Sequence, residues 1–162
     1  MLDRTAGFGQ KRTVKEIYGG QVHSSLEPLI RKWRTADIGV LPSYGEAIIR
    51  STFLEAGIEP SKDLITLYSA IGGMKSDDRD LWRLWSLSEI DGRKAETNEF
   101  GVLFSDYLLE SWVYRVKPIS KEVSAIYVDY FDGKASILVA TSLEQFFSLY
   151  AANADKLLTQ VG

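Results

Sequence analysis

Apolar residues recur at helical spacing in the first half of the chain. The first such segment predicts a short helix that starts near Ser25. Its apolar stripe, at positions i, i+3, i+4 and i+7, consists of Leu26, Leu29, Ile30 and Trp33. A second helix is expected over about residues 44–56, where Ser43 and Glu46 have the spacing of a capping box. A third is expected to open at Pro60, since proline is tolerated in the first turn of a helix.

After residue 80 the pattern changes to runs of aromatic and β-branched residues, which are typical of strands. The runs are Leu81–Leu87, Phe100–Leu109, Trp112–Val116, Val123–Phe131 and Ala135–Thr141. Asp132-Gly133 predicts a hairpin between the last two runs, because a tight primed turn needs positive φ values, which Asp and Gly adopt at the least cost. Thr141 or Ser142 is expected to cap a closing helix. The apolar stripe of that helix is Leu143, Phe146, Phe147 and Tyr150.

Helices followed by a run of strands and a final helix predict an α+β fold. We expect one domain, with a mainly antiparallel sheet of about five or six strands packed by helices. This domain is expected over residues 24–162, preceded by a loosely structured leader over residues 1–23. The size of the chain, 162 residues, is sufficient for a single hydrophobic core.

The charge distribution is uneven. Residues 1–34 hold seven Lys/Arg and three Asp/Glu, whereas residues 35–162 hold twelve and nineteen, so the body of the chain carries a charge of −7. Nucleic-acid binding needs clustered basic side chains, and we therefore expect no nucleic-acid partner. An acidic body is better suited to a basic protein. No apolar run has the length of a membrane span, and no signal core is recognisable, so we expect a cytoplasmic protein without membrane contact.

Residues with catalytic potential are scarce. The chain has no cysteine and one histidine, His23, without a recognisable carboxylate and nucleophile to form a catalytic set. Asp77, Asp78 and Asp80 lie close together, but they lack the alternating ligands and distal glutamate of a calcium loop. We expect no catalytic residue, no cofactor and no metal. The three aspartates are interpreted as a solvated acidic loop that attracts a basic partner.

Aromatic residues are the other candidates for an interface. In a strand, alternate side chains point to opposite faces, so Trp82 and Trp85 are expected on opposite faces of the sheet. One of them is then exposed unless helices cover both faces, and both alternatives are open at this point. Exposed aromatic residues often anchor protein interfaces. The candidate interface residues are Asp77, Asp78, Asp80, Trp82, Trp112 and Tyr130.

The order and spacing of several segments resemble the SUKH superfamily, which includes fungal Smi/Knr-type regulators of cell-wall assembly and bacterial immunity proteins. The segments are Leu67–Gly73, Trp82–Ile90, Phe104–Tyr107 and Thr141–Phe147. The family often has Gly-Asp-Phe where this chain has Ser105-Asp106-Tyr107. The resemblance covers about residues 40–158 and implies a fold more than a mechanism, because the matching residues are mostly core and turn positions.

For bacterial members, the resemblance implies an immunity protein that binds a cognate toxin and blocks it. The alternative that it implies is a regulatory protein-interaction domain of Smi/Knr type with an endogenous partner. Both are non-catalytic functions with a protein partner. The oligomeric state, the toxin and the position of the interface are not implied.

Overall fold

A computed structural model describes residues 23–158. The expected leader lies outside these residues except for His23, the first residue of the first helix described. The helices are α2 (His23–Thr35), α3 (Glu46–Glu55), α4 (Lys62–Ala70), α5 (Leu87–Gly92), the short 3-10 helix η1 (Lys94–Glu96) and α6 (Leu143–Leu158). The strands are β1 (Trp82–Leu84), β2 (Val102–Tyr107), β3 (Trp112–Pro118), β4 (Ser124–Asp129) and β5 (Ile137–Ala140).

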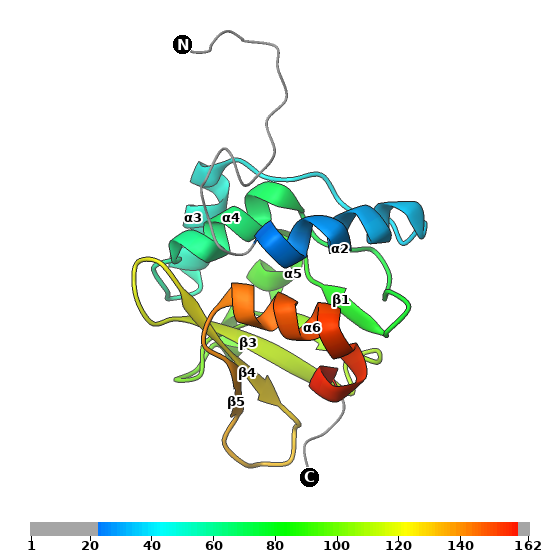
Figure 1. Cartoon of the computed structure of the whole chain (residues 1–162). Helices are drawn as coiled ribbons and strands as arrows, with labels where there is room; N and C mark the ends of the chain where they lie inside the picture. Colours follow the sequence, from blue (N-terminus) through cyan, green and yellow to red (C-terminus); the bar gives the residue numbers. More distant parts are fainter. Residues whose placement is uncertain (1–22, 159–162) are drawn as a thin grey trace, which may run out of the picture.

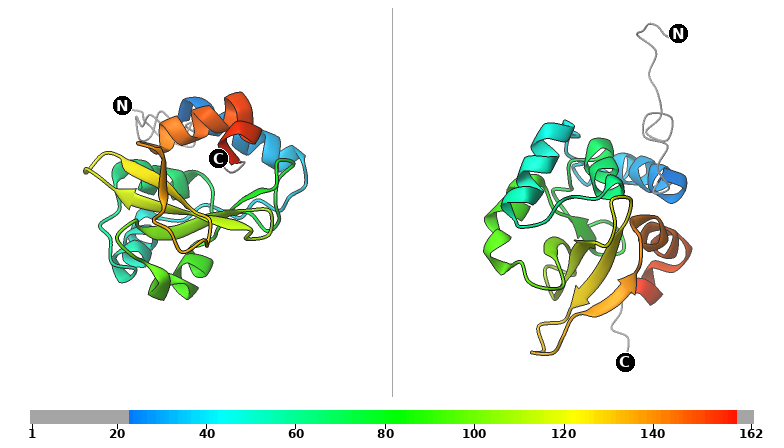
Figure 2. Two further views of the ribbon diagram at one scale, coloured as in Figure 1. Left: turned by 90° about the horizontal axis from the view of Figure 1, so that it is seen from below. Right: turned by 90° about the vertical axis from the view of Figure 1, so that its left-hand side faces the viewer.

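The five strands form one sheet in the order β1-β2-β3-β4-β5, and every neighbouring pair is antiparallel. The expected α+β fold with an antiparallel sheet is therefore confirmed. Helices lie on both faces of the sheet: α2 and α6 cover one face, and α3 and α5 lie on the other (Figure 1 and Figure 2). Because the strands are joined as a meander, alternate connections gather at the same end of the sheet.

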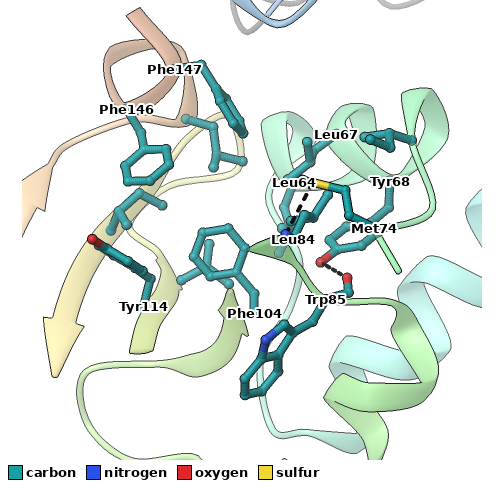
Figure 3. Packing of buried hydrophobic residues seen from close by; sticks show 14 of the residues in the cluster. Leu64, Leu67, Tyr68, Met74, Leu84, Trp85, Phe104, Tyr114, Phe146 and Phe147 are labelled. Carbon is teal, nitrogen blue, oxygen red and sulfur yellow. Dashed lines mark hydrogen bonds between the residues drawn. The ribbon is translucent and has the colours of Figure 1, made fainter. Parts of the chain in front are cut away.

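The core is built from aromatic and aliphatic side chains of both layers. Phe146 of α6 packs against Phe104 of β2 and Tyr114 of β3, with ring centroids 6.5 and 5.7 Å apart (Figure 3). On α4, the Tyr68 hydroxyl donates a hydrogen bond of 2.8 Å to the carbonyl oxygen of Trp85. The expected apolar stripes of the helices point inward, and all four stripe residues of α2 and all four of α6 are buried.

Two local expectations are wrong. Ser43 does not cap α3, which begins at Glu46 with Gly45 as an N-cap residue that makes no side-chain cap bond. The strand expected over residues 81–87 ends at Leu84, because Ser86 and Glu89 form a capping box that starts α5. The cap expected for the last helix is confirmed, since Ser142 Oγ accepts a 2.9 Å hydrogen bond from the amide of Gln145.

The connection between β4 and β5 is also longer than expected. The two strands are antiparallel neighbours, as Asp132-Gly133 indicates. However, β4 ends at Asp129 and β5 begins at Ile137, so residues 130–136 form a loop in place of a two-residue turn. This loop lies at the end of the sheet where the candidate interface residues gather.

Candidate functional site

Three segments that are distant in sequence meet at one end of the sheet. In the strand register, Trp82 at the start of β1 lies opposite Tyr107 at the end of β2, and Tyr107 lies opposite Trp112 at the start of β3. Val113 pairs with Asp129 at the end of β4. We call the combined segments 77–81, 107–112 and 129–134 the strand-end surface. All six interface candidates from the sequence belong to these segments or, in the case of Trp82, directly follow one.

The strand-end surface is acidic. Its acidic residues are Asp77, Asp78, Asp80, Glu110, Asp129 and Asp132, and its basic residues are Arg79 and Lys134. Six negative and two positive charges give the three segments a formal net charge of −4, and Arg93 and Arg115 of neighbouring segments pair with Glu110 and Asp129. At the opposite end of the sheet, the turn 117–122 holds two lysines and one glutamate, a net charge of +1. The chain therefore has a polarity of charge along its strands that favours approach of a basic partner at one end.

An aromatic ladder runs across this surface from β2 through β3 to the first residue after β4. Tyr107 and Trp112 stack with ring centroids 4.8 Å apart and an interplanar angle of 22°. Tyr130 contacts the other side of Trp112 edge-on, at a centroid distance of 5.2 Å. All three side chains are half-buried. The ladder thus holds Trp112 and Tyr130 in fixed positions while part of each ring remains accessible, as in aromatic interface anchors.

Large apolar side chains are exposed beside the ladder. They are Leu81, Leu108, Leu109 and Phe131. Leu109, at the tip of the β2–β3 connection, is the most exposed of them, at 84%. The sequence pattern does not single out these residues, because it places Leu108 and Leu109 in the strand expected over residues 100–109, and Leu81 and Phe131 at the ends of two other expected strands. β2 in fact ends at Tyr107, so Leu108 and Leu109 lie in the turn that follows the strand and do not pair with a neighbouring strand.

Of the two alternatives for Trp82 and Trp85, the structure has the one in which helices cover both faces, so Trp82 is wrong as an interface candidate. Its side chain is 0% exposed, because helices cover both faces of the sheet. Its indole ring stacks on Trp33 of α2 and contacts rings of α6, among them Tyr150 at 5.4 Å. Trp85, on the opposite face, is also buried. Both tryptophans are core residues, and neither can contact a partner.

Asp78 is likewise not part of a solvated loop. Its carboxylate is buried and accepts hydrogen bonds from the indole of Trp33 at 2.9 Å and from the hydroxyl of Tyr150. The other carboxylate oxygen accepts from the amides of Asp80 and Trp82, at 2.9 and 3.1 Å. A buried carboxylate with four donors is well satisfied. Asp78 therefore fixes the acidic loop to α2 and α6, and only its neighbours face solvent.

Asp77 and Asp80 remain candidates, since both side chains are half-buried. Partial burial raises the pKa of Asp77, and the negative charge of nearby Asp106 raises it further. The charge of Arg83 and a hydrogen bond with the backbone of Leu109 act in the opposite direction. Asp77 is thus linked both to the tip of the β2–β3 connection and to a partly buried charge cluster beside it.

This cluster is centred on Arg83, Glu89 and Asp106. The Arg83 guanidinium makes a bidentate pair with Glu89, at 3.0 and 2.8 Å, and lies 3.4 Å from Asp106 Oδ2. The Trp85 indole donates to the same Asp106 oxygen at 2.6 Å, and the amide of Glu110 donates to the other at 3.3 Å. Burial raises the pKa of Asp106, while the Trp85 bond and Arg83 lower it. Asp106 therefore satisfies a backbone amide of the turn, and its geometry is that of a structural carboxylate.

An apolar groove continues the surface along β5. It has a volume of about 270 Å³ and lies between β5 and the last turns of α6. Tyr130 belongs to both the groove and the ladder. Ile137, Leu138 and Leu149 also line it and are exposed. The strand-end surface thus adjoins a further exposed apolar region that begins at Tyr130.

A larger hollow, of about 980 Å³, lies at the opposite end of the sheet, between the α3–α4 connection and the β3–β4 turn. Its charges compensate one another. Arg50 pairs with Glu46 at 2.8 Å and with Glu59 at 3.3 Å. This hollow therefore lacks the net negative charge of the strand-end surface, and we do not assign the interface to it.

Comparison with protein-family models, curated proteins and solved structures gives no match. Within residues 23–158, no group of three or more His, Cys, Asp or Glu side chains is placed to hold a metal ion. Among the helices of the same residues, none has the length and apolar character needed to cross a membrane.

Proposed function

We propose that this chain is a non-catalytic protein-binding domain that recognises a basic protein through the strand-end surface. The observation that carries the proposal is the coincidence, at one end of the sheet, of a net charge of −4 with a half-exposed aromatic ladder. Interfaces commonly combine a central aromatic cluster with a charged rim that accelerates and orients association. Tyr107, Trp112 and Tyr130 would form the centre, and Asp77, Asp80 and Asp132 would form the rim.

The specific role that we propose is that of an immunity protein. The resemblance of the sequence to the SUKH superfamily supports this role, since bacterial members neutralise cognate toxins. An acidic, preformed surface on a small domain is suited to cover the basic face of a toxin, because opposite charges steer the encounter. The protein to test as the partner is the one encoded by the reading frame next to the gene, since immunity genes commonly adjoin their toxin genes. We call this probe the adjacent-frame protein.

The double variant Asp80→Lys/Asp132→Lys tests the charge of the surface. It changes the net charge of the three segments from −4 to 0 and should weaken binding to this probe by roughly tenfold or more, mainly through slower association. The measurement is the dissociation constant and association rate at low and at physiological salt. The same variant should also protect cells that express the toxin less well than the original protein does.

The matched control is Glu59→Lys/Glu122→Lys, which changes the total charge by the same amount at the opposite end of the molecule. We expect its affinity for the probe to stay within about threefold of the original, the range of a general charge effect. Equal weakening by both double variants, or absence of binding by the original protein, would refute the assignment of the surface.

The Smi/Knr-type alternative predicts a different partner. If the adjacent protein does not bind, but a stoichiometric complex with an endogenous protein is isolated and is sensitive to Asp80→Lys/Asp132→Lys, the surface is correct and the immunity role is wrong.

A further inference from the structure

The turn between β2 and β3 has an unusual backbone. Leu108, Leu109 and Glu110 have φ values of 51°, 52° and 64°, so three consecutive non-glycine residues lie in the left-handed region. This region is unfavourable for residues with a Cβ atom, and side chains larger than Asn or Asp are rare in it. Glycine or asparagine would form the same turn at lower conformational cost.

Three hydrogen bonds and one ion pair hold this backbone in place. The amide of Leu108 donates to the carbonyl oxygen of Leu81 at 2.8 Å, and that of Glu110 donates to Asp106 at 3.3 Å. The Glu110 carboxylate pairs with Arg93 at 2.9 Å. The amide of Ser111 closes the turn on the carbonyl oxygen of Tyr107 at 3.0 Å. The backbone of the turn is therefore fixed by its contacts, and the side chain of Leu109 extends from it into solvent.

Leu109 gains little from this arrangement within the chain. Its side chain is 84% exposed, so burial of apolar surface does not offset the strained backbone. A residue that is costly in conformation and unburied in the free protein is typical of a position whose packing is completed by a partner. The carboxylate of Asp77, which is hydrogen-bonded to the backbone of Leu109, would lie at the rim of such a contact.

We infer that Leu109 is the apolar anchor of the interface and inserts into an apolar pocket of the partner that is bordered by basic side chains. This inference rests on the proposed function and specifies the chemistry of the partner's site. The strained turn fixes the leucine before binding, so its ordering costs little entropy when the complex forms. Basic residues around the pocket would pair with the carboxylates beside the turn.

The variant Leu109→Asn tests the anchor. Asparagine tolerates the left-handed region but cannot fill an apolar pocket. We expect the midpoint of thermal unfolding to rise by about 2 °C, while the dissociation constant of the complex with the adjacent-frame protein rises tenfold or more, equivalent to about 1.4 kcal/mol. A gain in stability together with a loss of affinity is not expected from a residue with a merely structural role.

The control is Ile119→Asn, at the β3–β4 turn of the opposite end. Ile119 is an exposed apolar residue of comparable size, and its φ is not in the left-handed region. Its replacement should change affinity less than twofold and should not raise the unfolding midpoint.

The outcomes separate the two proposals. If Asp80→Lys/Asp132→Lys weakens binding and Leu109→Asn does not, the anchor is refuted and the surface stands. A lower unfolding midpoint for Leu109→Asn would show that the left-handed backbone at Leu109 is not strained, and would refute the part of the inference that depends on this strain. If neither variant affects binding to the adjacent-frame protein, both the anchor and the proposed function are wrong.

Discussion

Replacement of Trp82 by alanine should destabilise the protein by about 3–5 kcal/mol, the usual cost of removing a large aromatic side chain from a core. The ring is fully buried between two helices, stacked on Trp33 at 5.7 Å and in contact with Phe147 at 5.9 Å. Its loss would leave a cavity between β1, α2 and α6. The free energy of unfolding in urea measures the effect.

The matched variant is Trp112→Ala, because Trp112 lies at the same end of the sheet but is half-buried. We expect a loss of about 1–2 kcal/mol from its reduced burial and a clear loss of affinity for the partner, since Trp112 is the centre of the ladder. The division of roles between the two tryptophans would be contradicted if Trp112→Ala destabilised the fold as much as Trp82→Ala.

Gly72→Ala should cost roughly 3 kcal/mol of stability, at the upper end of the range for overpacked sites. A Cβ atom at this position would lie 1.8 Å from the carbonyl oxygen of Pro42, so the backbone must move. The segments that contain Pro42 and Gly72 cannot separate easily, because two backbone hydrogen bonds join them. The amide of Gly72 donates to the carbonyl oxygen of Leu41 at 3.1 Å, and the amide of Leu41 donates to the carbonyl oxygen of Gly73 at 2.9 Å. Thermal or urea unfolding of the variant gives the measurement.

Gly92→Ala is the control for this substitution and should have the opposite sign. Gly92 is the last residue of α5, and no atom lies within 4 Å of a Cβ placed there. Alanine has a higher helix propensity than glycine, so we expect a gain of up to about 1 kcal/mol. Similar losses for both variants would show that close packing on Pro42 does not determine the effect at Gly72.

The helices and the antiparallel sheet could be predicted because their apolar periodicities are regular. The stripe from Leu26 to Trp33 and that from Leu143 to Tyr150 are buried as the spacing indicates. Helix α5 could not be predicted in the same way. It has only six residues, and its apolar residues continue directly from β1, so the run resembles one longer strand. The Ser86–Glu89 capping box was the available signal.

The candidate site was predicted in part. Trp112 and Tyr130 were selected as aromatic residues of separate strands, and their contact depends on strand register, which the composition of each strand does not determine. Trp82 and Asp78 were misinterpreted for a related reason. A sequence shows that a residue lies on one face of a strand or in an acidic loop, but not that α6 covers that face and supplies Tyr150 to the loop.

Leu109 was missed because turn conformation is not encoded in hydrophobicity. Leu108 and Leu109 extend the apolar run of β2, and neither is a residue type that favours positive φ. The turn is imposed by tertiary contacts, among them the hydrogen bond from Leu108 to Leu81 and the pair between Glu110 and Arg93. Such contacts between separate segments become visible only in three dimensions.

Amide hydrogen exchange of the full chain, with and without the adjacent-frame protein, shows whether the acidic end of the sheet is the surface that binds a basic protein. Binding should slow exchange in segments 77–81, 107–112 and 129–134 and leave the turn 117–122 unchanged. Slower exchange confined to the turn 117–122 and the α3–α4 connection, with no change at the three acidic segments, would contradict this assignment of the surface.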